Sequence, residues 1–148
     1  MPHRKLNRPL NVLLAEDDKD YRFLFEQALK EIPVPTRLAM VENGEDLMEY
    51  LIEHALHLPD LLFLDLSMPR KTGFECLSEI KGNELLNDLP VVVLTVSLPN
   101  DIGYELSMEK MLNELGAQDY IRKPHDFEML KKAIHNALIM AVEKKNKK

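Results

Sequence analysis

The sequence predicts an α/β fold, in which a doubly wound, five-stranded parallel sheet carries helices on both faces. Three observations predict it. Several short runs are continuously apolar, as is typical of strands that are buried on both sides. The segments between them repeat apolar residues at helical spacing. The two patterns alternate five times along the chain, and right-handed crossovers between successive strands then give a single domain.

The first strand is expected at residues 10–15, a run too short and too uniformly apolar for an amphipathic helix. A helix is expected next, because apolar side chains recur on one helical face until Pro33, which ends it. Residues 37–41 are the second expected strand. The expected buried stripe of this first helix consists of Tyr21, Leu24, Phe25, Ala28, Leu29 and Ile32.

The middle of the chain holds two more helices and two more strands. Asn43 and Gly44 open the second helix, and a strand at residues 61–64 follows it. Pro90 precedes the fourth strand, which is expected at residues 91–94. The apolar side chains that should line the two helices are Leu47, Met48, Leu51 and Ala55 in the second, and Phe74, Leu77, Ile80 and Leu85 in the third.

The last strand is expected at residues 119–122, and the clearest helical pattern follows it. Asp126 is a candidate N-cap for this helix. Apolar residues then keep helical period for about four turns. They are Phe127, Leu130, Ile134, Ala137, Leu138 and Ala141.

Length and charge limit the classes of function. The 148 residues suffice for one domain, expected at residues 10–143 between a basic N-terminal arm (1–9) and a basic C-terminal tail (144–148). The net charge is −6, and the domain itself holds 12 basic against 25 acidic residues. Such a body repels phosphates, so we do not expect the domain to bind nucleic acid.

Membrane insertion and sulfur-based metal sites are not expected either. The longest apolar runs are far shorter than the roughly 18 residues that a membrane span needs, and no apolar signal core follows the N-terminal basic residues. We therefore expect a cytoplasmic protein. The one cysteine, Cys76, cannot form an internal disulfide and is expected to be a packing residue.

Polar side chains stand where four of the expected strands end. Glu16 and Asp17 follow the first strand, Asp65 the third, Thr95 the fourth and Lys123 the fifth. In an open α/β sheet these ends share the edge at which ligands bind. Converging carboxylates repel one another unless a hard cation is bound, and oxygen-only ligands favour Mg²⁺. A lysine and a hydroxyl opposite the metal leave room for a phosphoryl group.

These motifs resemble those of the receiver domains of two-component response regulators, over about residues 10–140. The motifs are LAEDD at 14–18, LDLSMP at 64–69 with Gly73, LT at 94–95 and YIRKP at 120–124. The resemblance implies a flavodoxin-like (βα)5 fold with strand order 2-1-3-4-5. Residues 68–73 and 90–95 are also similar to the single-domain regulators that are linked to phytochrome-type histidine kinases.

The resemblance implies a nucleophile and a metal site. Asp65 would accept a phosphoryl group, since a carboxylate forms an acyl phosphate when nearby cations neutralise the transferred group. Glu16, Asp17 and Asp65 would bind Mg²⁺ through their carboxylates, and Ser67 would bind it through its backbone carbonyl. Asp18, the next acidic residue, is expected instead to interact with the positive end of the following helix.

The resemblance also implies a switch and its partners. Lys123 would pair with the phosphoryl oxygens, Thr95 would donate a hydrogen bond to one of them, and the rotamer of Tyr120 would follow Thr95. The phosphoryl group would come from a sensor histidine kinase or a phosphotransfer protein. With no second domain in the sequence, we expect a stand-alone regulator. It would signal by binding a downstream protein, and a homodimer is one arrangement that the resemblance allows. It would assist its own phosphorylation and dephosphorylation without being an enzyme.

Some residues depart from the family pattern. Val96 is branched where receivers usually have a small residue, which predicts slower access of water or small phosphodonors to the phosphoryl pocket. The segment 96–115 is longer than usual by about six residues, nearly two helical turns. His125 stands where the family usually has an aromatic residue, and a cis peptide bond is expected before Pro124.

Three other functions are compatible with parts of the pattern. An aspartyl phosphatase or phosphotransferase needs a second carboxylate two residues after Asp65, where Ser67 stands instead. In a flavodoxin-type FMN protein, the acidic loop after the first strand would repel the FMN phosphate. A degenerate receiver that acts only as a scaffold would lack a site residue, whereas every site residue is present here.

Overall fold

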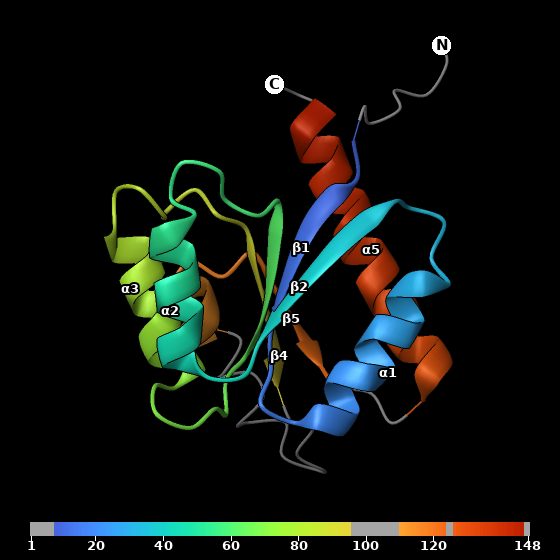
Figure 1. Ribbon diagram of the computed structural model, residues 1–148, viewed down its shortest axis with the longest axis horizontal. Coiled ribbons are helices and arrows are strands. Elements are labelled where there is room, and N and C mark those ends of the chain that lie inside the picture. Colours follow the sequence, from blue (N-terminus) through green and yellow to red (C-terminus); the bar gives the residue numbers. More distant parts are fainter. Residues whose placement is uncertain (1–7, 96–109, 124–125, 147–148) are drawn as a thin grey trace.

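The computed structural model describes residues 8–95, 110–123 and 126–146. Within them, five parallel strands form one sheet in the order β2-β1-β3-β4-β5 (Figure 1), which confirms the expected fold class and strand order. Every strand begins and ends within one residue of its expected bounds. The strands are β1 (Leu10–Ala15), β2 (Thr36–Val41), β3 (Leu61–Asp65), β4 (Val91–Thr95) and β5 (Asp119–Arg122).

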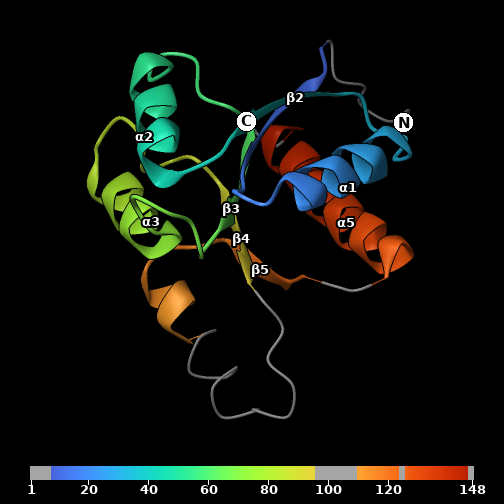
Figure 2. The same ribbon diagram turned by 60° about the horizontal axis from the view of Figure 1, so that its bottom comes forward.

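Helices cover both faces of the sheet. Helices α1 (Lys19–Lys30) and α5 (Phe127–Asn146) lie side by side on one face, and α2 (Gly44–Glu53) and α3 (Gly73–Gly82) lie on the other (Figure 2). Residues 110–114 are helical as well. Helix α5 continues through the 143 boundary into the expected basic tail and ends at Asn146.

The sheet separates two apolar cores, which explains why its strands are continuously apolar. In β1, Val12 and Leu14 belong to the core under α1 and α5, whereas Leu13 and Ala15 belong to the core under α2 and α3. Because successive strand residues point to opposite faces, every position of β1, β3 and β4 that lies between helices must be apolar.

Two apolar residues of the expected helical stripes are exposed. The prediction is wrong for Leu24, whose exposed fraction is 44%, because the buried face of α1 is narrower than the stripe and Leu24 lies at its margin. It is also wrong for Leu85, which is 61% exposed. Helix α3 ends at Gly82, and in the turn that follows it is Leu86 that enters the core.

Capping residues fix where the helices begin. The Asn43 side chain accepts a hydrogen bond from the backbone N–H of Asp46 (2.8 Å), and Asp126 accepts one from Glu128 (2.8 Å), as their positions in the sequence predict. Thr72 and Glu75 form a capping box at the start of α3. Cys76 is buried in the core under α2 and α3, as expected.

Among the described residues, no helix is both long enough and apolar enough to span a membrane.

Candidate functional site

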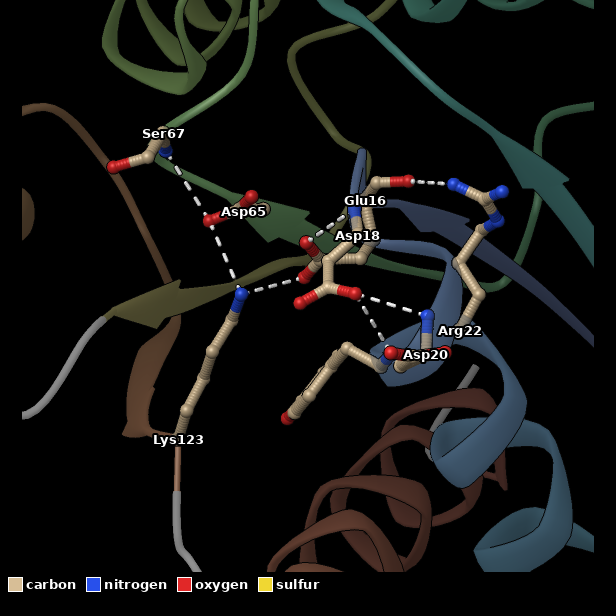
Figure 3. Close-up of polar contacts among 8 residues, drawn as sticks. Glu16, Asp18, Asp20, Arg22, Asp65, Ser67 and Lys123 are labelled. Atoms are coloured by element: carbon tan, nitrogen blue, oxygen red, sulfur yellow. Dashed lines mark hydrogen bonds and ion pairs between the residues drawn. The ribbon is translucent and has the colours of Figure 1, made fainter.

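The predicted site residues meet at the carboxyl edge of the sheet. Glu16 and Asp17 directly follow β1, Asp65 is the last residue of β3, Thr95 is the last residue of β4, and Lys123 directly follows β5. Figure 3 shows Glu16, Asp65 and Lys123 turned toward one another from three different strands. The edge is aligned because neighbouring strands are in register: Ala15 pairs with Leu64, Asp65 with Leu94, and Thr95 with Arg122.

Three carboxylates form the acidic half of the site. Glu16, Asp17 and Asp65 each offer an oxygen, and these oxygens lie within 4.8 Å of one another. Glu16 is fully buried and Asp65 is 2% exposed, whereas Asp17 is open to solvent. Buried carboxylates this close repel one another, and an oxygen-only group with one open side suits a hard divalent cation such as Mg²⁺. The donor set therefore fits the predicted metal.

Lys123 supplies the basic half of the site. Its Nζ lies 2.7 Å from Glu16 Oε1 and 3.5 Å from Asp65 Oδ1. Asp65 Oδ1 also accepts a hydrogen bond from the backbone N–H of Ser67 (3.2 Å). Burial, and then the negative charge of Glu16, raise the pKa of the Asp65 carboxyl to about 7, while Lys123 and the Ser67 N–H act in the opposite direction. One ammonium does not compensate two buried carboxylates.

Local hydrogen bonds hold Glu16 in place. Its Oε2 accepts from the backbone N–H of Asp18 (3.1 Å), and its carbonyl oxygen accepts from Arg22 Nη1 (2.8 Å). Asp18 is the N-cap of α1 and accepts from the N–H groups of Asp20 (2.9 Å) and Tyr21 (3.3 Å). Asp18 therefore interacts with the positive end of the helix, as expected. The role of Arg22 was not predicted, because its contact with the Glu16 carbonyl depends on the orientation of α1 relative to β1.

Tyr21 was predicted only as an apolar stripe residue, yet it borders the site. The Lys123 Nζ lies 4.5 Å from the centre of its ring. The Tyr21 hydroxyl oxygen is buried and has no hydrogen-bond partner among the described residues. Burial, and then the charges of Glu16 and Asp65, raise the pKa of this hydroxyl, so it stays protonated. No motif in the sequence marks this residue.

The first residue of α3 lies directly against the backbone of Asp65. A Cβ on Gly73 would lie 2.3 Å from the Asp65 carbonyl oxygen, and a Cβ on Gly44 would lie 2.1 Å from the carbonyl oxygen of Lys71. Arg70 has a φ of 70°, in the left-handed region that non-glycine residues rarely adopt. Gly73 was part of the predicted motif, whereas the roles of Gly44 and Arg70 could not be read from the sequence.

The two predicted switch residues lie on neighbouring strands. Thr95 is 8% exposed, and its carbonyl oxygen accepts a hydrogen bond from the backbone N–H of Lys123 (2.7 Å). Tyr120 pairs in register with Val93 and packs, half-buried, against the core under α2 and α3. The roles of both residues, and metal binding by the Ser67 carbonyl, stay predictions.

Several predicted features lie outside the described residues. They are Val96, the segment 96–109, the Pro124 peptide bond and His125.

The fold and the site together define a class of protein. Residues 12–135 match the response regulator receiver domain, and the chain belongs to this family.

Individual members of the family are similar over most of the chain. The probable methanogenesis regulatory protein FilR2 of Methanothrix harundinacea is 33% identical over 129 residues, which cover 85% of this chain and 79% of FilR2. The response regulator Rcp1 of Synechocystis is 36% identical over 115 residues, which cover 73% of this chain and 78% of Rcp1.

Solved structures agree with these sequence matches. The Mn²⁺-bound form of Rcp1 has a TM-score of 0.72 and 32% identity, with 86% of this chain and 91% of that chain covered. The phosphorylated cyanobacterial phytochrome response regulator RcpA has a TM-score of 0.71 and 32% identity, with 87% of this chain and 91% of that chain covered. The expected similarity to phytochrome-linked regulators is thereby confirmed.

Proposed function

We propose that Asp65 accepts a phosphoryl group from the phosphohistidine of a sensor histidine kinase or a phosphotransfer protein. The observation that carries the proposal is the position of the Asp65 carboxylate, buried at the carboxyl edge of the sheet, 3.5 Å from the Lys123 ammonium and within the three-carboxylate group. Burial raises the pKa of this carboxyl, which is costly for the fold, and carboxyls with such raised pKa values are concentrated at functional sites.

The transfer follows from the chemistry of these groups. An Asp65 oxygen attacks the phosphorus, the bond between phosphorus and the donor nitrogen breaks, and its electron pair stays on that nitrogen, which leaves an acyl phosphate on Asp65. Lys123 neutralises charge on the phosphoryl oxygens, and the Thr95 hydroxyl donates a hydrogen bond to one of them. Mg²⁺, held by Glu16, Asp17, Asp65 and the Ser67 carbonyl, would supply further positive charge there.

The output of the switch is proposed to be binding. Phosphate on Asp65 would change the populations of two states that involve Thr95 and Tyr120, and one state would bind a downstream protein. The similarity to a phosphorylated phytochrome response regulator supports a phytochrome-type kinase as the donor. A stand-alone role, a homodimer and a cytoplasmic location stay predictions.

Phosphorylation by a small donor tests the proposal without knowledge of the kinase. With acetyl phosphate and Mg²⁺, intact-mass spectrometry should show one phosphoryl group per chain, and hydroxylamine should remove it, as expected for an acyl phosphate. Asp65→Asn should abolish the modification. Asp119→Asn, which changes an exposed aspartate at the start of β5, should leave it unchanged. A modification that persists in Asp65→Asn or resists hydroxylamine would refute the assignment.

A further inference from the structure

The Lys123 ammonium is held by contacts of two kinds. Within the described part of the chain, it lies close to the carboxylates of Glu16 (2.7 Å) and Asp65 (3.5 Å) and over the ring of Tyr21 (4.5 Å to the ring centre). An ammonium within about 6 Å of an aromatic ring centre is attracted by the negative face of the ring. Tyr21 is buried and Lys123 is largely buried, so water screens this attraction little.

The carboxylate contacts are the ones that a divalent cation weakens. Glu16 and Asp65 belong to the group of oxygens that fits Mg²⁺, so a bound cation would draw on the same negative charge and repel the ammonium. The Tyr21 ring carries no charge and offers no carboxylate oxygen. Its attraction for the ammonium therefore persists when the acidic group is neutralised.

The backbone of Tyr21 is fixed at the start of α1, and its side chain is buried. Tyr21 lies in the first turn of α1, where its backbone N–H donates to the N-cap Asp18 (3.3 Å). The hydroxyl oxygen, in contrast, is buried without a hydrogen-bond partner among the residues that the structure describes. Since the hydroxyl makes no hydrogen bond to the ammonium and the ammonium lies over the ring, the contact with Lys123 depends on the ring.

We propose that Tyr21 is a positioning residue, whose ring keeps the Lys123 ammonium beside Asp65 when a divalent cation occupies the acidic group. Its effect on phosphoryl transfer rests on the proposed function, whereas the position of the ammonium does not. Without the ring, the flexible lysine side chain would spend less time at Asp65 once the cation is bound.

Two substitutions separate the ring from the hydroxyl. Tyr21→Phe keeps the ring and removes the hydroxyl, whereas Tyr21→Met replaces the ring with a flexible apolar side chain that still fills space. Tyr21→Leu serves if the methionine variant does not fold. Phe25→Leu is the matched control, because Phe25 is also a buried aromatic residue of α1 but packs edge-to-face on Phe63 in the core (ring centres 5.0 Å apart).

The first measurement uses no phosphodonor. NMR chemical shifts of the Lys123 ε-methylene protons should show the upfield shift expected over an aromatic ring in the wild type, with and without Mg²⁺. The upfield shift should be retained in Tyr21→Phe and Phe25→Leu and lost in Tyr21→Met. Lys123 signals that do not differ between wild type and Tyr21→Met, or that lose the upfield shift on adding Mg²⁺, would overturn the proposal.

The second measurement is the initial rate of Asp65 phosphorylation by acetyl phosphate at saturating Mg²⁺. We expect Tyr21→Met to be about 3- to 10-fold slower than wild type, the size of a partly buried cation–π contact, and Tyr21→Phe and Phe25→Leu to differ from wild type by less than about twofold. A slow Tyr21→Phe, or a Phe25→Leu as slow as Tyr21→Met, would overturn the role of the ring. If even the wild type takes no phosphate, the proposed function fails, and the NMR measurement still decides the position of Lys123.

Discussion

Removing the charge of Asp65 should stabilise the metal-free protein, and more so at higher pH. The pKa of this carboxyl is about 7 in the folded protein, against an ordinary value of 3.8. The folded state therefore binds the proton more tightly than the unfolded state, and the resulting stabilisation is complete below pH 4 and is lost as the pH rises through 7. Asp65→Asn carries no such charge and avoids this loss.

The magnitude follows from the two pKa values. Each tenfold difference in proton affinity corresponds to about 1.4 kcal/mol, so the full loss for Asp65 is about 4 kcal/mol above pH 7. Between pH 5 and pH 8, the free energy of unfolding of Asp65→Asn relative to wild type should rise by about 2–3 kcal/mol.

Urea unfolding at pH 5, 6, 7 and 8, with EDTA and constant ionic strength, measures this difference. Asp119→Asn is the control, because Asp119 is exposed and its substitution should give no comparable rise with pH. If the difference in free energy of unfolding between Asp65→Asn and wild type were the same at pH 5 and pH 8, the idea that the buried Asp65 charge destabilises the fold would be refuted.

Three further predictions follow from the site. Mg²⁺ should raise the melting temperature of the wild type in a thermal scan, because it binds the acidic group of the folded protein only. Asp17→Asn should lose most of that rise. Identical melting temperatures of the wild type with and without Mg²⁺ would argue against a cation site. Gly73→Ala should destabilise the fold by about 2 kcal/mol or more in urea unfolding, since its Cβ would lie 2.3 Å from the Asp65 carbonyl oxygen, whereas Gly82→Ala, with open space around it, should not. Thr95→Ala should still be phosphorylated on Asp65, while partner binding should depend less on phosphorylation in a pull-down assay; an unchanged dependence would remove Thr95 from the switch.

The sequence was sufficient to predict the site residues that the strand ends bring together. Asp65 and Lys123 are far apart in the chain, but each follows a short apolar run, and parallel strands bring such positions to one edge. Helical margins were harder to predict. Leu24 and Leu85 are apolar at plausible spacing, yet only the packing of α1 and the end of α3 decide that both are exposed.

Contacts between a helix and the strand-end residues were beyond prediction from sequence. Nothing in the pattern around Tyr21 indicates that its ring lies beneath an ammonium from the other end of the chain, because this contact depends on the angle between α1 and β5. The left-handed backbone conformation of Arg70 could not be predicted either, since this conformation is normally expected at glycine or asparagine.

The separation of the interior into two cores has a consequence for the amino-acid substitutions that this protein can accumulate. Phe25 packs only on the α1–α5 side and Leu77 only on the α2–α3 side, and the residues of each strand alternate between the two. The edge that carries the carboxylates is contacted from both layers, by Tyr21 of α1 and by Gly73 of α3. Substitutions in the parts of one layer that do not contact the site can therefore accumulate, and give that layer a new binding specificity, without repacking the opposite layer.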